Sequence, residues 1–208
     1  MLTYSDLDPN KKAFIFELDD VLYPKQDYLL QVYYLFANFL EYTETSPPAS
    51  DLINFLKDTY LLAGQDGIFH KAAEKFGIDK KYEENFNRLH VNAQLPLKLL
   101  VYPSVLDLLK SIIKDHKSIF ILTKGNPLMQ LNKLKYMEWE GLDKELKVYF
   151  HDEIKLVSDK EPLDYLINDN SLVVKEIIMI GNSKEEQIIA KSREVDYLHI
   201  SFLLSSAQ

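Results

Sequence analysis

The sequence contains no cysteine, although it is 208 residues long. Without thiols the chain can form no disulfide, use no thiolate nucleophile, and bind no zinc or iron–sulfur cluster through cysteine. Five histidines are present, but none shows the spacing typical of metal ligands. The sequence therefore directs attention to carboxylates, hydroxyls, amides and amines.

Positive charge is also scarce, because 24 Lys and Arg residues stand against 32 Asp and Glu residues, for a formal net charge of -8. Such a surface repels nucleic acid and anionic lipid. No apolar run approaches the roughly 18–20 residues that a membrane span requires. Residues 1–12 include Asp6 and Asp8 and have no apolar segment typical of a signal peptide. We therefore expect a cytoplasmic protein that binds neither nucleic acid nor membrane.

The apolar pattern predicts strands that alternate with helices. Short apolar runs typical of buried strands occupy residues 13–18, 118–122 and 176–180, with weaker candidates at 147–150 and 196–201. Helical patterns lie between the later strands, including one at 160–167. This order favours an α/β fold with a doubly wound, Rossmann-like parallel sheet and helices on both faces.

Residues 25–98 differ from the rest of the chain, because helical periodicity continues there without any strand-like alternation. We expect a core domain formed by residues 1–24 and 99–208, with residues 25–98 inserted as an all-helical cap. The aromatic-rich helix at 28–42 is predicted to form cap core or a cap–core interface, with a homodimer contact as the alternative.

Two helix starts carry local signals. Ser104, followed three residues later by Asp107, predicts a capping box. Asn126 followed by Pro127 predicts an N-cap and a first helical residue.

Polar residues follow the three best strands. The strand ends read Glu17-Leu18-Asp19, Thr123-Lys124-Gly125 and Gly181-Asn182-Ser183. In open parallel sheets, ligands bind beyond the carboxyl ends of the strands. If the three strands are neighbours, one crevice receives carboxylates, a hydroxyl and two helix N-termini, and the N-termini suit a phosphate. Lys160 lies where a fourth loop can deliver a cation.

The order of these pieces resembles the haloacid-dehalogenase-like (HAD) hydrolase superfamily. Residues 16–23, FELDDVLY, resemble its first motif, DxDx followed by Thr or Val. Thr123 is similar to the second motif, and Lys160 followed by Glu161-Pro162 is similar to the third. Residues 181–188, GNSKEEQI, resemble the fourth motif, GDSxxxDI. The helical insert lies where many members carry a cap, so the resemblance extends from residue 14 to residue 190.

The resemblance implies roles for individual residues. Asp19 matches the general acid/base, and Glu17 stands in the place of the nucleophilic Asp. Thr123 and Lys160 match the groups that hold the phosphoryl oxygens. Lys124 and Gly125 of the same loop are grouped with them as phosphate-binding residues. Mg²⁺, the implied cofactor, would be bound by Glu17, Asp19 and Asn182.

Several of these positions depart from the family pattern. Glu17 is one methylene longer than Asp, which moves its carboxylate by about 1.5 Å. Asn182 and Gln187 replace the two acids of the fourth motif and bring no charge, whereas Mg²⁺ usually binds through one or two carboxylates. We therefore predict weakened Mg²⁺ binding, with Glu186 open as a substitute ligand. Nucleophile and metal site are altered together.

Three functions follow from this interpretation. The first is a phosphatase of weak or absent activity on small phosphate esters. The second is a non-catalytic module that binds inorganic phosphate or a small phosphorylated molecule. The third is an interaction protein, a pseudoenzyme whose cap binds a partner chain.

Overall fold

The computed structural model describes residues 2–204, which form two compact units. The first unit contains Leu99–Gln130 together with the described residues before Lys25 and from Met137 onward. The second contains Lys25–Lys98 and Leu131–Tyr136. The helical unit therefore includes a short segment from later in the chain as well as the inserted residues.

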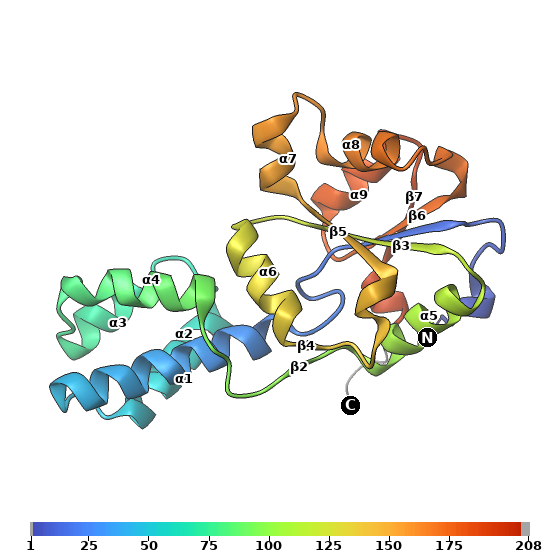
Figure 1. Ribbon diagram of the computed structural model, residues 1–208. Coiled ribbons are helices and arrows are strands. Elements are labelled where there is room, and N and C mark those ends of the chain that lie inside the picture. Colours follow the sequence, from blue (N-terminus) through green and yellow to red (C-terminus); the bar gives the residue numbers. More distant parts are fainter. Residues whose placement is uncertain (1, 205–208) are drawn as a thin grey trace. The chain divides into compact units, whose positions relative to one another are not determined.

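The first unit is built on a parallel sheet of five strands in the order β5-β3-β1-β6-β7 (Figure 1). This arrangement confirms the predicted α/β fold with a parallel sheet, including its weaker strands. The strands are β1 (Ala13–Phe16), β3 (Ser118–Thr123), β5 (Leu146–Phe150), β6 (Ile177–Gly181) and β7 (Asp196–His199).

The central strand explains why the sequence signal is strong. All four residues of β1 are buried, because β1 lies between β3 and β6 and is covered on both faces. A strand in this position reads as a continuous apolar run rather than an alternating one. In register, Phe16 lies opposite Ile121 on one side and Ile180 on the other.

Helices cover both faces of the sheet. On one face, Ile154, Leu163 and Ala190 bring three helices into a single core cluster with the strands. Figure 1 shows α5 on the opposite side of the sheet. The helices of this unit are α5 (Pro103–Lys114), the first turn of α6 (Pro127–Tyr136), α7 (His151–Val157), α8 (Pro162–Asp169) and α9 (Lys184–Lys191).

Short elements connect these larger ones. A second, two-stranded parallel sheet pairs β2 with β4. The short elements are η1 (Tyr4–Asp6), β2 (Leu99–Leu100), β4 (Met137–Glu138), η3 (Leu142–Glu145), η4 (Val174–Glu176) and η5 (Ile200–Phe202).

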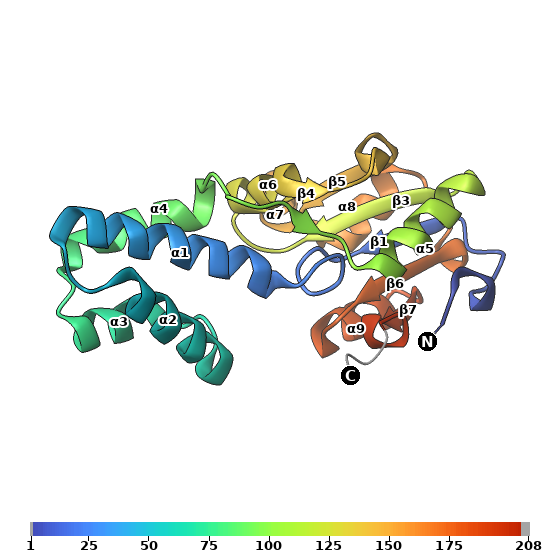
Figure 2. The ribbon, with the colours of Figure 1, turned by 90° about the horizontal axis from the view of Figure 1, so that it is seen from below.

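The second unit is helical and has an aromatic core. Phe36 contacts Phe86 at a ring-centroid distance of 4.9 Å and Phe69 at 6.0 Å. Figure 2 shows α4 on one side of α1 and α2 with α3 on the other. Its elements are α1 (Lys25–Glu44), α2 (Ala49–Ala63), α3 (Ile68–Phe76), η2 (Lys80–Tyr82), α4 (Glu83–Asn92) and the last six residues of α6. Its role as a cap stays a prediction.

The helix starts gave mixed results. Asn126 caps α6 as predicted, since its side-chain oxygen accepts a 3.1 Å hydrogen bond from the Met129 backbone N–H. The capping box at Ser104 was wrong: α5 begins at Pro103, with Tyr102 in the cap position and no side-chain cap bond. Proline suits the first helical position, so the helix begins one residue before the serine. Helix α7 was not predicted.

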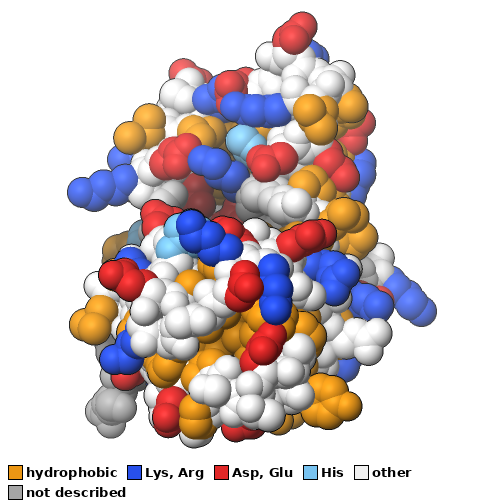
Figure 3. Space-filling model, turned by 90° about the vertical axis from the view of Figure 1, so that its left-hand side faces the viewer, with side chains coloured by type: hydrophobic (Ala, Val, Ile, Leu, Met, Phe, Trp, Pro, Cys, Tyr) orange, Lys and Arg blue, Asp and Glu red, His pale blue; other side chains and the backbone are white. Residues whose placement is uncertain are grey.

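Within residues 2–204, no helix combines the length and the apolar character needed to cross a membrane. Figure 3 shows acidic and basic side chains interspersed on one face of the molecule rather than a continuous basic patch.

Candidate functional site

The sheet brings the predicted strand ends together. β1 pairs with β3 on one side and β6 on the other, all three in parallel, so their carboxyl ends meet at one edge. Glu17 follows β1, Thr123 is the last residue of β3, and Gly181 is the last residue of β6. The three strands are therefore neighbours, as the predicted crevice requires.

Glu17 and Thr123 are in direct contact. The Thr123 hydroxyl donates a 2.7 Å hydrogen bond to the Glu17 carboxyl, and the Gln130 amide donates a 3.1 Å hydrogen bond to that hydroxyl. Gln130 also donates a 2.6 Å hydrogen bond to the Lys124 carbonyl, which fixes the amide in place. Because a hydroxyl has a single proton, the Thr123 proton is already used within the protein. Thr123 has no exposed surface and Gln130 only 1%.

Burial changes the charge state of Glu17. The pKa of this carboxyl is raised from 4.5 to about 8, mainly by removal from water and to a smaller extent by the nearby carboxylates of Glu186 and Asp19. The hydrogen bonds from Thr123 and from the Leu18 backbone N–H oppose this shift but do not cancel it. At neutral pH the Glu17 carboxyl is therefore mostly protonated and neutral.

Asp19 lies in the same loop and has its own partners. The Tyr23 phenol donates a 2.9 Å hydrogen bond to its carboxylate. The Asn182 side-chain amide donates a 3.2 Å hydrogen bond to the Asp19 backbone carbonyl. This second contact joins the loop after β1 to the loop after β6.

Glu186 serves the start of α9. Its carboxylate accepts hydrogen bonds from the backbone N–H groups of Asn182, at 2.9 Å, and Ser183, at 3.1 Å. The Ser183 hydroxyl accepts in turn from the Glu186 backbone N–H at 3.2 Å, which completes a capping box. A Cβ on Gly181 would lie 2.2 Å from the Glu186 carboxylate oxygen, so the close approach requires glycine. Gln187, on the next position of the helix, is partly buried.

The predicted cations lie at the rim or outside the cavity. The exposed Lys124 ammonium pairs with Glu185 at 3.1 Å. Lys160 is exposed in the loop before α8, and its backbone N–H donates to the Ser158 hydroxyl at 3.1 Å. Glu161, the next residue, pairs with Lys155 at 3.7 Å. Of the predicted phosphate-binding side chains, Thr123 and Lys124 line the cavity described below, whereas Lys160 does not.

Gly125 has a backbone role in this loop. Its φ of 111° lies in a region that residues with a side chain rarely adopt. A Cβ there would make ordinary van der Waals contact with the Gln130 amide nitrogen, at 3.5 Å, so the backbone conformation rather than lack of space favours glycine. The glycine therefore lets the loop turn in front of the Gln130 side chain.

The cavity at these strand ends is small and acidic. Its volume is about 60 Å³, with apolar walls and four carboxyl groups. Lys124 and His151 are the basic side chains along the described lining. The lining residues are Glu17, Leu122, Thr123, Lys124, His151, Glu161, Pro162, Leu163, Met179, Glu185, Glu186 and Ile189.

Solved structures share this architecture. A dehalogenase solved with an intermediate complex is 14% identical over 97% of this chain and 90% of its own, with a TM-score of 0.58. A HAD family hydrolase from Deinococcus radiodurans R1 with bound phosphate and sodium is 13% identical over 92% and 81%, with a TM-score of 0.57. A HAD phosphatase from Thermococcus onnurineus is 21% identical over 89% and 84%, with a TM-score of 0.54. No protein-family model and no curated protein sequence matches the chain.

The chain has the HAD-like hydrolase fold. At these identities the likeness concerns the fold, so the roles of individual residues rest on the geometry of the site.

The donors at this edge of the HAD-like fold do not fit Mg²⁺. The ion favours charged oxygens in near-ideal octahedral geometry. The Glu17 carboxyl already accepts the Thr123 proton in a hydrogen bond, and Asn182 donates its amide N–H to a carbonyl instead of lending charge. Within residues 2–204, no three His, Asp or Glu side chains gather in a group that could hold a metal ion. Asp19 is the remaining acid of the predicted ligand set.

Sequence reasoning missed Gln130 and the capping role of Glu186. Gln130 follows Thr123 by seven residues and lies beyond the motifs of the HAD family. The available signal for Gln130 was its position. It is a polar residue in the first turns of a helix whose N-cap and first residue had already been predicted. The pattern of Ser183 followed three residues later by Glu186 was a readable capping box.

Proposed function

We propose that this chain is a HAD-fold pseudoenzyme, with phosphatase activity that is weak or absent and with weakened affinity for Mg²⁺. The observation that supports the proposal is the hydrogen-bond chain from Gln130 through Thr123 to Glu17. In the resemblance to the HAD motifs, Glu17 stands at the nucleophile position and Thr123 at the position of the phosphoryl-binding hydroxyl. The hydrogen-bond chain engages both groups at the same time.

Each part of phosphoryl transfer is affected. A neutral carboxyl is a poor nucleophile, and Glu17 is mostly protonated at neutral pH. Its longer side chain also displaces the carboxylate by about 1.5 Å, and a misplacement of about 1 Å can cost 10²-fold in rate. Phosphoryl transfer depends on a metal ion to neutralise developing charge, so a weakened metal site adds to the loss.

Charge in the cavity also disfavours a phosphate dianion. Glu161, Glu185 and Glu186 line it together with Glu17, and the Lys124 ammonium is already paired with Glu185. We expect phosphate affinity to be low while Thr123 donates to Glu17. A phosphate-binding module, which the bound phosphate of the Deinococcus structure suggests, is the alternative.

The test is Mg²⁺-dependent release of phosphate from a panel of small phosphate esters. It compares the wild type with Glu17→Asp, Asn182→Asp and the double variant, with Asp19→Asn added to each as the inactive control. We expect the wild type to remain at background and the double variant to gain turnover that Asp19→Asn removes.

Two results would separate the alternatives. Wild-type turnover as high as that of the double variant, and abolished by Asp19→Asn, would show a fully working phosphatase and refute the proposal. Tight phosphate binding by the inactive wild type, measured by calorimetry without Mg²⁺, would favour the phosphate-binding module. Partner binding by the helical unit and homodimer formation stay predictions.

A further inference from the structure

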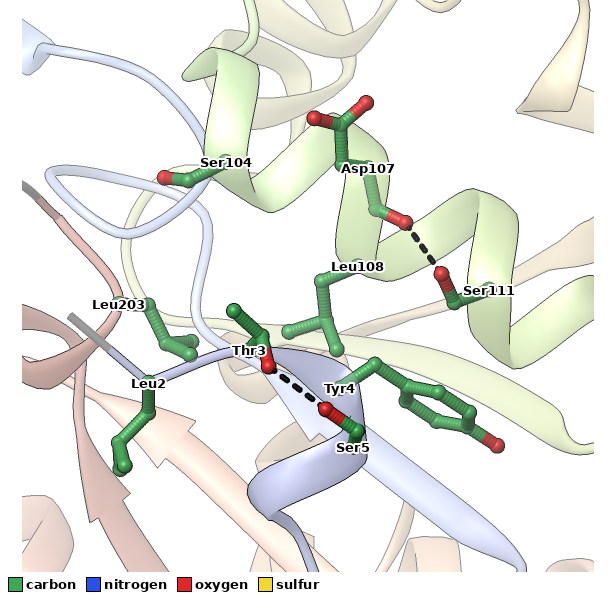
Figure 4. A pocket seen from close by; sticks show the side chains of 9 residues that line it. All are labelled: Leu2, Thr3, Tyr4, Ser5, Ser104, Asp107, Leu108, Ser111 and Leu203. Carbon is green, nitrogen blue, oxygen red and sulfur yellow. Dashed lines mark hydrogen bonds between the residues drawn. The ribbon is translucent and has the colours of Figure 1, made fainter.

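A cavity of about 360 Å³ in the first unit does not gather its polar groups around one point. Figure 4 shows the Asp107 carboxylate directed away from Ser5 and Ser111. The two serine hydroxyls contact groups of the protein instead: Ser5 contacts the Thr3 hydroxyl at 2.9 Å, and Ser111 donates to the Asp107 backbone carbonyl at 2.8 Å. The helical unit, by contrast, buries polar atoms that have no hydrogen-bond partner.

Two such atoms lie in the aromatic core of the helical unit. The Tyr33 hydroxyl and the Nε2 atom of His90 are buried and form no hydrogen bond within residues 2–204. Tyr33 has no exposed surface, and His90 has 8%. Buried polar side-chain atoms are in large majority hydrogen-bonded, so two exceptions in one core mark an unusual position.

The contacts of His90 define its charge state. Its Nδ1 lies 2.9 Å from the Phe86 backbone carbonyl, one turn earlier on α4. Because a carbonyl oxygen only accepts, Nδ1 carries a proton, and in the neutral ring Nε2 has only a lone pair. The pKa of the imidazole is lowered, mainly by removal from water and also by Lys133, whereas the contact with the Phe86 carbonyl opposes this shift. At neutral pH the buried ring is therefore uncharged.

His90 lies at the contact between α1 and α4, which are neighbours in Figure 2. Its ring centroid is 4.4 Å from that of Phe86 and 5.9 Å from that of Tyr33. Tyr33 also stacks on Phe86 at 6.1 Å. The Tyr28 hydroxyl donates a 2.7 Å hydrogen bond to the His90 backbone carbonyl. The His90 side chain is therefore part of the packing that holds the two helices together.

Lys133 places a positive charge near this contact. It belongs to the part of α6 within the helical unit and has 1% exposed surface. Its ammonium lies 5.2 Å from the centroid of the Tyr28 ring and repels a charged imidazole. The phenols that face His90 are Tyr28 and Tyr33 on α1, and Tyr60 of α2 acts on Tyr33. A phenol titrates at about pH 10, so these groups offer lone pairs but no negative charge in acid.

We propose that protonation of His90 separates α4 from α1, so that the helical unit opens at mildly acidic pH. A proton on Nε2 gives the ring a full charge and a second donor, which has no acceptor in the described part of the chain. In the open state the imidazole is solvated and takes up a proton at about pH 6.5. Stability of the helical unit is therefore complete above about pH 6.5 and is lost as the pH falls below it.

The experiment measures amide hydrogen exchange of the full chain at pH values from about 7.5 to about 5. The wild type is compared with His90→Gln, whose side-chain amide can donate to the Phe86 carbonyl but does not titrate. Each pH unit below about 6.5 raises the opening constant up to tenfold, so buried amides of α1 and α4 should lose up to about thirtyfold more protection in the wild type than in the variant. Amides of β1 and β3 should show no such difference.

Two further measurements assign the effect to His90. His70→Gln is the matched control, because His70 belongs to the same unit and its side chain is 66% exposed. Its protection should follow the wild type at every pH. In the wild type, NMR should show the His90 ring still neutral and protonated at Nδ1 at about pH 6, where an unperturbed histidine is mostly charged. This last measurement does not depend on the folding of any variant.

Three results would overturn the proposal. These are an equal loss of protection in wild type and His90→Gln, a His90 ring that is charged at about pH 6 while α1 and α4 stay protected, and a loss of protection in β1 and β3 together with the helical unit. Titration of Glu17 cannot imitate the effect, because its raised pKa lowers stability as the pH rises. The residues around His90 include none of the hydrogen-bond chain at the strand ends, so failure here leaves the proposed function untouched.

Discussion

Glu17→Gln should make the protein more stable at neutral and alkaline pH. In the folded chain the pKa of Glu17 is raised from 4.5 to about 8, mainly because the carboxyl is removed from water. The folded state therefore holds a proton that the unfolded state releases. For an acid with a raised pKa, stability is unaffected below about pH 4.5 and is lost as the pH rises toward about 8. Glutamine keeps the shape and the acceptor oxygen of the neutral side chain, and it does not titrate.

The size of the effect follows from the linkage of protonation to folding. Each pKa unit corresponds to about 1.4 kcal/mol. Between about pH 5 and pH 8, the wild type should lose about 3 kcal/mol of unfolding free energy through Glu17, as an upper value. The unfolding free energy of Glu17→Gln should not show this pH-dependent loss. The difference between the two proteins should therefore widen with pH.

The assay is urea unfolding of both proteins at a series of pH values from about 5 to 8, at constant ionic strength. Glu185→Gln is the matched control, because Glu185 lines the same cavity but is 67% exposed in its side chain. We expect its stability to follow the wild type in parallel. Parallel profiles for wild type and Glu17→Gln would refute the raised pKa and, with it, the account of a neutral Glu17.

Two further predictions concern packing. Gly181→Ala should cost about 1–2 kcal/mol in urea unfolding, because the new methyl group displaces the Glu186 carboxylate from the backbone N–H groups that it caps; stability within about 0.5 kcal/mol of wild type would contradict this. Leu166→Ala should cost about 2–5 kcal/mol, since Leu166 is completely buried in the sheet's core cluster, while Leu156→Ala, at a side chain 84% exposed, should cost almost nothing. Equal costs for the two leucine variants would contradict the assigned core.

The order of strands and helices could be predicted because burial leaves a direct mark on the sequence. A strand such as β1, covered on both faces, admits only apolar residues, and Glu17 marks its end. Helix α7 was missed because seven residues with a single buried side chain, Ile154, leave too short a pattern to recognise. Its existence depends on contacts with the neighbouring strand and helix rather than on local sequence.

The candidate site was less accessible to sequence reasoning for a similar reason. The pattern placed Glu17 and Thr123 at one sheet edge, but it could not show that they bond to each other or that Gln130 completes the chain. Lys160 illustrates the reverse problem. Its position in the motif order was suitable, yet an exposed side chain in a loop is directed by loop conformation, which residue spacing does not encode.

The contact between Thr123 and Glu17 also constrains how this sequence can evolve. Shortening Glu17 to aspartate draws its carboxylate back by about 1.5 Å and leaves the buried Thr123 proton without an acceptor, at a cost of about 1–3 kcal/mol. Under the proposed function, turnover would still require an acid at Asn182. Shortening Glu17 alone would therefore cost stability before any catalytic benefit arrived, so this hydrogen bond would oppose a stepwise return of catalysis that begins at Glu17.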